Sequence, residues 1–145
     1  MINDVRRIVQ NRLNSIKTTY GIREVSYRLA SDAKMFPHVV YDFVAISPTD
    51  MGRTDFTLDI HIWAKNTADG TGQTNAFEIM DSIRDLFAFW NAPDVLTSQD
   101  VLPTFYETSG GQIEDPDKTI IHLVLRYEGQ TYEEDATDSS ILGKE

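Results

Sequence analysis

The chain contains no cysteine among its 145 residues. Disulfide bonds, thiolate metal sites and a cysteine nucleophile are therefore excluded. Long apolar runs are also missing, since none approaches the ~18 residues that a membrane-spanning helix needs. Residues 1–7 (MINDVRR) lack the apolar core of a signal peptide. These absences predict a soluble protein that is made in a cytoplasm and has no membrane partner.

Basic residues are scarce. Lysine and arginine number 13 against 23 aspartate and glutamate, which gives a net charge of −10 and a sequence pI of about 4.6. A protein that binds duplex DNA normally presents a basic face. The acidic composition instead predicts a surface that repels nucleic acid. The length suits one domain with a core large enough to fold without disulfides or structural metals.

Recognisable catalytic motifs are missing as well. Residues 69–74 (DGTGQT) precede a predicted helix but match neither the P-loop nor the dinucleotide fingerprint. Asp59 and His61 share one face of a predicted strand, a pairing that suits a base or a metal ligand. A metal centre needs three or four converging ligands, and no second histidine is close in sequence. The sequence therefore predicts no enzyme and no cofactor, with a small metal-binding enzyme that uses Asp59 and His61 as an alternative.

Apolar periodicity divides the chain into helices and strands. Spacings of three and four residues predict one helix from a cap at Asn3 to a stop at Gly21, and a second over about residues 73–90 with Thr74 as its cap. Two-residue alternation predicts strands over residues 23–29, 37–46, 55–66, 101–108 and 119–127. We expect an α+β fold with a mostly antiparallel sheet, two helices packed on one face, and the order α-β-β-β-α-β-β.

Two of these strands carry apolar surface that the helices do not account for. The strand over residues 37–46 is apolar on both faces, and Val40, Val44 and Ile46 are expected on the face away from the helices. Trp63 stands on the polar face of the next strand, where a large aromatic side chain often marks a contact. These four residues are the predicted oligomer interface. Loops of the same subunit are the alternative cover, and packing at the sheet edge is the alternative for Trp63.

The end of the chain differs in composition from the rest. Residues 129–145 are polar and acidic, and such a segment buries too little apolar surface to offset the entropy of ordering. We therefore expect a single domain over residues 1–128 and a flexible tail over residues 129–145. Ile141 and Leu142 stand together near the end and are a candidate anchor for a groove on a neighbouring subunit or on a partner. A solvated tail without a role is the alternative.

Three segments carry a resemblance to a known family: residues 36–41 (FPHVVY), residues 58–64 (LDIHIWA) and residues 123–127 (LVLRY). Their composition and order resemble the tail terminator, or tail completion, proteins of long-tailed bacteriophages over residues 2–128. The resemblance implies a homohexameric ring, without cofactor or catalytic residues, that caps the tail tube and stops its growth. It also implies a place at the head-proximal end of the tail in the virion, where the ring joins the tail tube protein to the head–tail connector protein.

The same resemblance gives the acidic composition a role. DNA must pass through such a ring without specific binding, and a like-charged channel prevents it from sticking. The candidate channel residues are Asp50, Asp55, Glu114, Asp115 and Asp117. The alternative function within the same class is a related head–tail connector or tail-tube component, which uses similar surfaces at another level of the particle.

Overall fold

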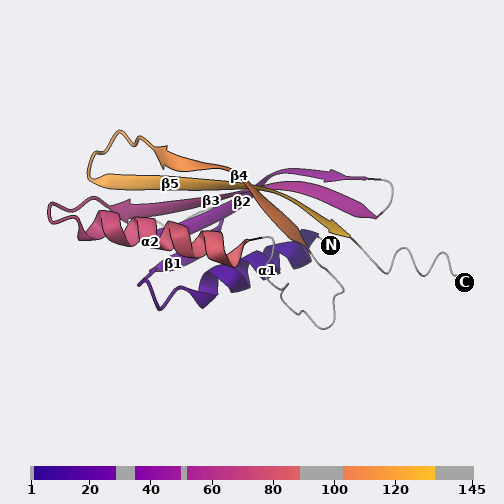
Figure 1. Cartoon of the computed structure of the whole chain (residues 1–145), viewed down its shortest axis with the longest axis horizontal. Coiled ribbons are helices and arrows are strands. Elements are labelled where there is room, and N and C mark those ends of the chain that lie inside the picture. The colour runs from indigo at the N-terminus through magenta and orange to yellow at the C-terminus, as the bar shows by residue number, and fades with distance from the viewer. Residues whose placement is uncertain (1, 29–34, 50–51, 89–102, 133–145) are drawn as a thin grey trace, which may run out of the picture.

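In a computed structural model, which describes residues 2–28, 35–49, 52–88 and 103–132, two helices pack on one face of a five-stranded sheet (Figure 1). The order α-β-β-β-α-β-β is the predicted one. None of the described helices is long and apolar enough to cross a membrane. The elements are α1 (Ile2–Ser15), β1 (Glu24–Tyr27), β2 (His38–Pro48), β3 (Arg53–Lys65), α2 (Thr71–Leu86), β4 (Thr104–Ile113) and β5 (Ile120–Tyr132).

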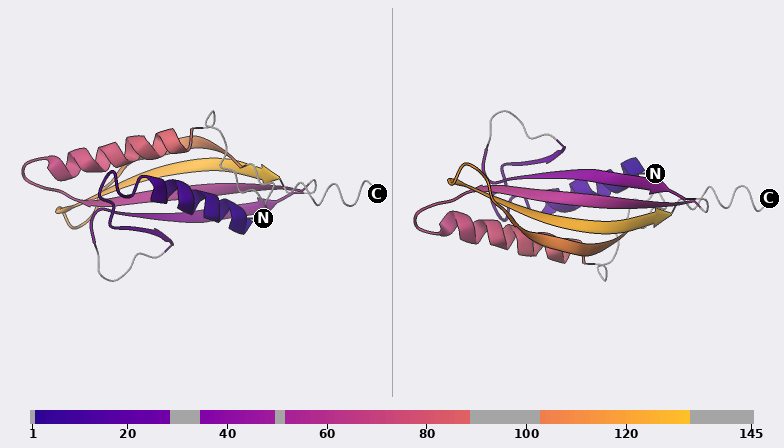
Figure 2. Two further views of the ribbon diagram at one scale, coloured as in Figure 1. Left: turned by 90° about the horizontal axis from the view of Figure 1, so that it is seen from below. Right: turned by 90° about the horizontal axis from the view of Figure 1, so that it is seen from above.

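The sheet has the spatial order β1-β2-β3-β5-β4. β1 is parallel to β2, and every other neighbouring pair is antiparallel. β3 and β5 pair along their whole lengths, from Arg53 opposite Tyr132 to Lys65 opposite Ile120. The short β1 lies at one edge of the sheet and β4 lies at the other, as Figure 2 shows from both sides.

The core lies between the helices and one face of the sheet (Figure 2). The two-residue alternation of the strands turns one set of side chains toward the helices, and the helical spacing returns a matching stripe from α1 and α2. Burial of this set removes the largest apolar side chains from water, which is the main stabilising contribution to the fold. The fully buried members include Val5, Ile8, Leu13, Tyr41, Leu58, Ile60, Ile62, Ile79, Ile83 and Leu123.

Helix ends differ from those predicted. Asn3 lies inside α1, where its Oδ1 accepts a hydrogen bond from Arg6 Nε at 3.0 Å, so it is not the cap. α1 ends at Ser15, and the chain continues in turns to Gly21, which has a φ of 66°. The N-cap of α2 is Gly70, four residues before the predicted cap Thr74.

A β-bulge in β2 overturns one predicted face. Phe43 is opposite Leu58 and Ala45 is opposite Thr57, so Val44 is the extra residue. An extra residue reverses the alternation beyond it. Ile46 therefore lies opposite Phe56, on the face that carries the helices and not on the open face with Val40. Ile46 is still exposed because the β2–β3 hairpin extends past the end of α1 (Figure 1).

Three glycines lie inside strands. Gly110 and Gly111 belong to β4, and Gly129 belongs to β5. A Cβ at Gly129 would overlap the Phe56 ring and the backbone oxygen of Thr104, so this glycine allows strand and ring to approach closely. The sheet consequently continues to Tyr132, four residues beyond the predicted domain end at residue 128.

Candidate assembly surface

The sheet face opposite the helices is open in the part of the chain that the structure describes (Figure 2). On β3 this face carries Thr57, Asp59, His61 and Trp63, as the alternation predicts, because the intervening residues are buried in the core. On β5 the register places His122 opposite Trp63 and also brings Val124, Arg126 and Glu128 to the same face.

A row of aromatic rings covers one end of the open face. Trp63 stacks on His122 with ring centroids 3.7 Å apart and an angle of 13° between the planes. His61 also contacts His122, with ring centroids 5.0 Å apart and Nδ1 of His61 only 2.8 Å from Nε2 of His122. His38 continues the row at 6.2 Å from Trp63. Trp63 is therefore packed within its own subunit as well as partly exposed.

The contact between His61 and His122 favours the neutral form of these imidazoles. One ring nitrogen must donate and the other accept in the His61–His122 contact, which two protonated rings cannot do. Burial, and after it the neighbouring His61, lower the pKa of His122 to about 4. Burial also lowers the pKa of His61. His61 and His122 are therefore uncharged near neutral pH.

The carboxylate of Asp59 belongs to a different network from His61. Arg126 donates from Nε to Asp59 Oδ1 at 2.7 Å and from Nη2 to Oδ2 at 2.8 Å. Such a bidentate pair fixes the carboxylate in place. Within the described residues, no group of three or more histidine, aspartate or glutamate side chains is placed to hold a metal ion. Asp59 and His61 thus contact different side chains, Arg126 and His122.

The four predicted interface residues do not form one patch. Val40 lies on the open face but is buried, with His61 opposite it on β3. Val44 is exposed at the bulge, and Ile46 is exposed on the opposite face. Trp63 lies in the ring row at the far end of the open face from the β2–β3 hairpin turn. Of the four, only Val44 and Ile46, two residues apart on β2, are exposed to solvent.

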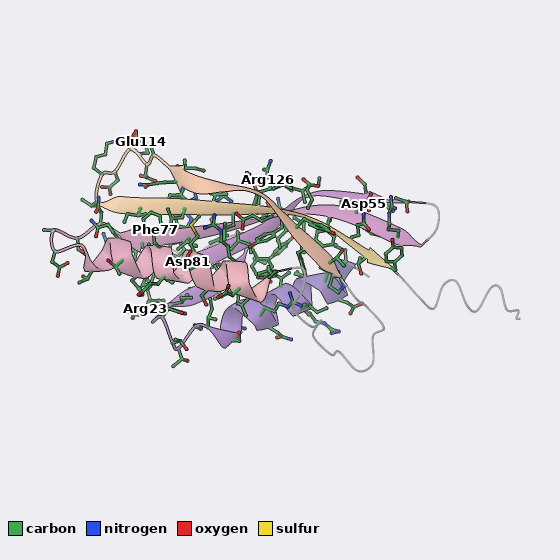
Figure 3. The ribbon with its side chains drawn as sticks, in the orientation of Figure 1. Arg23, Asp55, Phe77, Asp81, Glu114 and Arg126 are labelled. Carbon is green, nitrogen blue, oxygen red and sulfur yellow. The ribbon has the colours of Figure 1, made fainter. Side chains whose placement is uncertain are left out.

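The predicted channel acids lie toward opposite ends of the sheet, as Asp55 and Glu114 show in Figure 3. Asp55 is on β3 and pairs with Arg53 at 2.9 Å. Glu114 is in the β4–β5 connection and pairs with Lys118 at 3.4 Å. In the same connection, hydrogen bonds from Thr119 lower the pKa of Asp117, and Asp115 Oδ1 accepts from the Asp117 amide at 2.8 Å.

Other predicted residues lie outside the described part of the chain, namely Asp50, Ile141 and Leu142. Conversely, three exposed side chains on the open face were not predicted: Tyr106, Ile113 and Tyr132. The alternation of residues 119–127 already separates His122 and Arg126 from the core positions. Their contacts with Trp63 and Asp59 depend on the β3–β5 register, which nothing in the local sequence specifies.

No family model matches the chain, and no curated protein sequence matches it significantly. Among solved structures, the fold is similar to a chain described as "Virion of native gene transfer agent (GTA) particle", with a TM-score of 0.63. The similarity covers 87% of this chain and 92% of that chain, at 12% sequence identity. At this identity the likeness shows a common fold.

Proposed function

We propose that this chain is a structural protein of a phage or phage-like virion. The observation that carries the proposal is the similarity of nearly the whole fold to a chain of a gene transfer agent virion, with 87% of this chain and 92% of that chain aligned. At this coverage the similarity is not confined to one motif. A non-enzymatic role also agrees with the separate hydrogen-bonded networks of Asp59 and His61.

Within the virion, we propose that copies of the chain form a ring, with six subunits as the family resemblance implies. The ring would cap the tail tube at its head-proximal end, stop its growth and join it to the head–tail connector protein. Two features support assembly: the described residues leave one sheet face uncovered, and exposed apolar side chains lie along the strands. Monomeric soluble proteins rarely leave large contiguous apolar surface exposed, so such surface favours a role in assembly.

The acidic composition supports passage of DNA through the ring without specific binding. A net charge of −10 opposes the counterion-release binding that cationic surfaces make with duplex DNA. Asp55 and the connection acids Glu114, Asp115 and Asp117 would place negative charge toward both ends of such a channel. Fluorescence anisotropy with labelled duplex DNA tests this point. We expect no binding at low salt, and tight binding that weakens with added salt would contradict an acidic channel.

A related head–tail connector or tail-tube component is the second candidate function. It is favoured by the same observation, because a shared fold at 12% identity suits any member of a stacked set of virion rings. The three roles differ in position along the particle and in their neighbours. Their common requirement is a closed oligomer.

Native mass spectrometry and negative-stain microscopy of the full chain test the ring. We expect a discrete oligomer of six subunits with a central opening, either in solution or after addition of purified tail tubes. A control preparation of the tubes without the protein shows whether the ring density depends on it. A chain that stays monomeric at all concentrations and does not bind to tubes would contradict the proposed function.

A further inference from the structure

Both edges of the sheet have strand segments that no other described strand pairs. β1 covers β2 only from His38 to Tyr41, which leaves residues 42–48 of β2 at an open edge. At the opposite edge, β5 is the one described strand that pairs with β4. Unpaired strand edges present backbone donors and acceptors that readily pair with another chain.

Exposed apolar side chains gather on these two edges. The large hydrophobic residues that the structure leaves exposed are Val44, Ile46, Phe77, Tyr106, Ile113 and Tyr132. Val44 and Ile46 belong to the open part of β2, and Tyr106 and Ile113 belong to β4. Four of the six thus lie on the two edge segments, where they would be buried if the edges were paired with other copies.

Charges that usually protect a sheet edge are absent or already paired here. Neither residues 42–48 nor β4 contains lysine, the commonest protecting residue. The acid of the β2 segment, Asp42, pairs with Arg28 at 3.4 Å. The acid of β4, Glu107, pairs with Arg84 at 3.0 Å. Each edge also has a bulge, but the regular segments 45–47 and 104–106 lie beyond the bulges.

The two regular segments run in opposite directions and lie at the same position along the strand axis, which is called their level below. Three successive antiparallel pairings separate β2 from β4, so their directions are opposite. Ala45 is level with Tyr106, because Thr57 is opposite Ala45 and Glu128 is opposite both Thr57 and Tyr106. A copy placed alongside by rotation about an axis parallel to the strands would therefore bring β4 antiparallel to β2 without an axial shift. Such a head-to-tail contact can close into a ring.

We propose that the edge of β4 in one copy pairs with residues 45–47 of β2 in the next copy, so that the sheets join around the ring. This inference rests on the proposed ring and specifies its contact. The occupant of each edge is a second copy of this chain, because the chain itself supplies two complementary edges of matching level and direction. The exposed side chains of Val44, Ile46 and Tyr106 would then be covered at every junction.

Engineered cysteines test the contact directly, because the chain has none of its own. The double variant A45C/Y106C places two thiols on the same sheet face and at the same level. Within one subunit three strand spacings separate them, which is about 14 Å. That distance exceeds the roughly 7 Å that a disulfide can span between Cα atoms. Mild oxidation should therefore produce a ladder of covalent oligomers that ends at the ring size. The matched control A45C/F77C places one thiol on α2, away from the edge, and should give no ladder.

Single-cysteine variants distinguish a head-to-tail contact from a two-fold one. A mixture of A45C and Y106C should form a covalent dimer, and neither variant alone should do so. Efficient dimers of either single variant, or no ladder above the A45C/F77C control, would overturn the proposal. If rings are seen by microscopy while the ladder fails, only this contact is wrong. If no oligomer forms either in solution or with purified tail tubes, the proposed function fails with it.

Charge placed on the edge gives an independent readout. Ile46 and Phe77 have equal exposed fractions, 46% each, so lysine at either position should leave the isolated subunit folded. I46K should weaken association in sedimentation velocity by about tenfold or more, because lysine at an edge opposes strand pairing. F77K should change association less than about twofold. Equal association of I46K and the wild type would overturn the proposal.

Discussion

At the scale of single residues, Gly129 sets how closely β5 approaches the core. A side chain there would overlap the Phe56 ring, and Phe56 is itself packed edge-on against Phe105 with centroids 5.6 Å apart. The glycine therefore serves packing inside a strand, although a glycine in sequence normally suggests a turn or a strand end.

The substitution G129A should destabilise the fold by roughly 2 kcal/mol or more, because the added methyl group displaces the Phe56 ring or the strand. G111A is the matched control, since a Cβ at Gly111 in β4 meets nothing within 4 Å. The control should change the free energy of unfolding by less than about 0.5 kcal/mol. Urea unfolding followed by circular dichroism measures both, and equal stability of the two variants would contradict this account of Gly129.

The lowered pKa of His122 should make the stability of the fold depend on pH. Its pKa is about 4 in the fold and about 6.5 when unfolded, so the unfolded state binds more protons between these values. The neutral ring therefore contributes stability that is fully present above pH 6.5 and is lost as the pH falls toward 4. We expect a loss of roughly 2 kcal/mol over this range.

The variant H122Q removes the titrating ring and should flatten the dependence of the unfolding free energy on pH between 6.5 and 4. Its stability at pH 7 is also expected to fall, because the stack with Trp63 is lost. The slope is therefore the readout, and the absolute value is not. Parallel curves for the wild type and H122Q would mean that His122 does not carry this pH dependence.

Sequence patterns predicted these residues unevenly. The alternation of β3 correctly placed His61 and Trp63 on the face away from the core, because a period of two depends only on local backbone geometry. The partner rings could not be predicted, since His122 reaches Trp63 only through the register of β5 on β3. Asp59 and His61 suggested a functional pair for the same reason. Their actual partners, Arg126 and His122, lie on β5, which is far from β3 in sequence.

At the scale of elements, the bulge in β2 shows where periodicity fails. Val39 and Tyr41 alternate as predicted, but the extra residue Val44 moves Ile46 to the other face. No glycine or proline marks the position, so the sequence gives no local signal for it. The order and type of the elements were nevertheless predictable, because the two helices and the strands β3 and β5 carry periodic apolar stripes.

The two helices are tied together by one buried arginine. Arg12 of α1 donates from Nη1 to the backbone oxygen of Leu86 at 3.0 Å, at the C-terminal end of α2. Its guanidinium carbon also lies 5.4 Å from the ring centroids of both Phe87 and Phe105. A cation at a helix C-terminus stabilises the exposed carbonyl groups there.

The variant R12M keeps most of the apolar stem and loses the hydrogen bond and the contact of the cation with the rings. We expect a cost of roughly 2 kcal/mol in the free energy of unfolding. R7M is the control, because Arg7 pairs with Asp4 on the same helix at the surface. The control should change stability by less than about 0.5 kcal/mol. Thermal melts of both proteins provide the measurement, and equal melting temperatures would contradict the role of Arg12.

At the scale of the whole molecule, the extent of the folded domain differs from the composition boundary. Composition changes at residue 129, but β5 continues to Tyr132, and Thr131 is fully buried. The first residues of the acidic segment therefore belong to β5. β5 is an inner strand that pairs with β3 on one side and β4 on the other, and these pairings hold its polar end in the sheet.

Two truncations should therefore behave differently. Removal of residues 133–145 should leave the melting temperature of the subunit unchanged, because all of β5 is retained. Removal of residues 129–145 should lower it by several degrees, since an unfolding free-energy loss of ~1 kcal/mol shifts the melting temperature by about 2–8 °C. Differential scanning calorimetry measures both. If the shorter truncation destabilises the subunit as much as the longer one, the domain boundary lies beyond Tyr132.

The proposal that Ile141 and Leu142 anchor the chain to a neighbour is tested with the same truncation. The protein without residues 133–145 should remain folded but should cap tail tubes less efficiently, which pull-down with purified tubes measures. The double substitution I141S/L142S keeps the segment length and charge but removes the proposed anchor, so it should show the same loss of capping. Full capping by both variants would leave the segment without a role in assembly.

The position of the protein in an assembled particle tests the central claim most directly. Cryo-electron microscopy of particles that carry a small fused tag on this chain would locate it. We predict a single ring of six copies at the head-proximal end of the tail tube, with the β4 edge of each copy against the β2 edge of the next. A tag distributed along the tube, located within the head shell, or absent from purified particles would contradict the account.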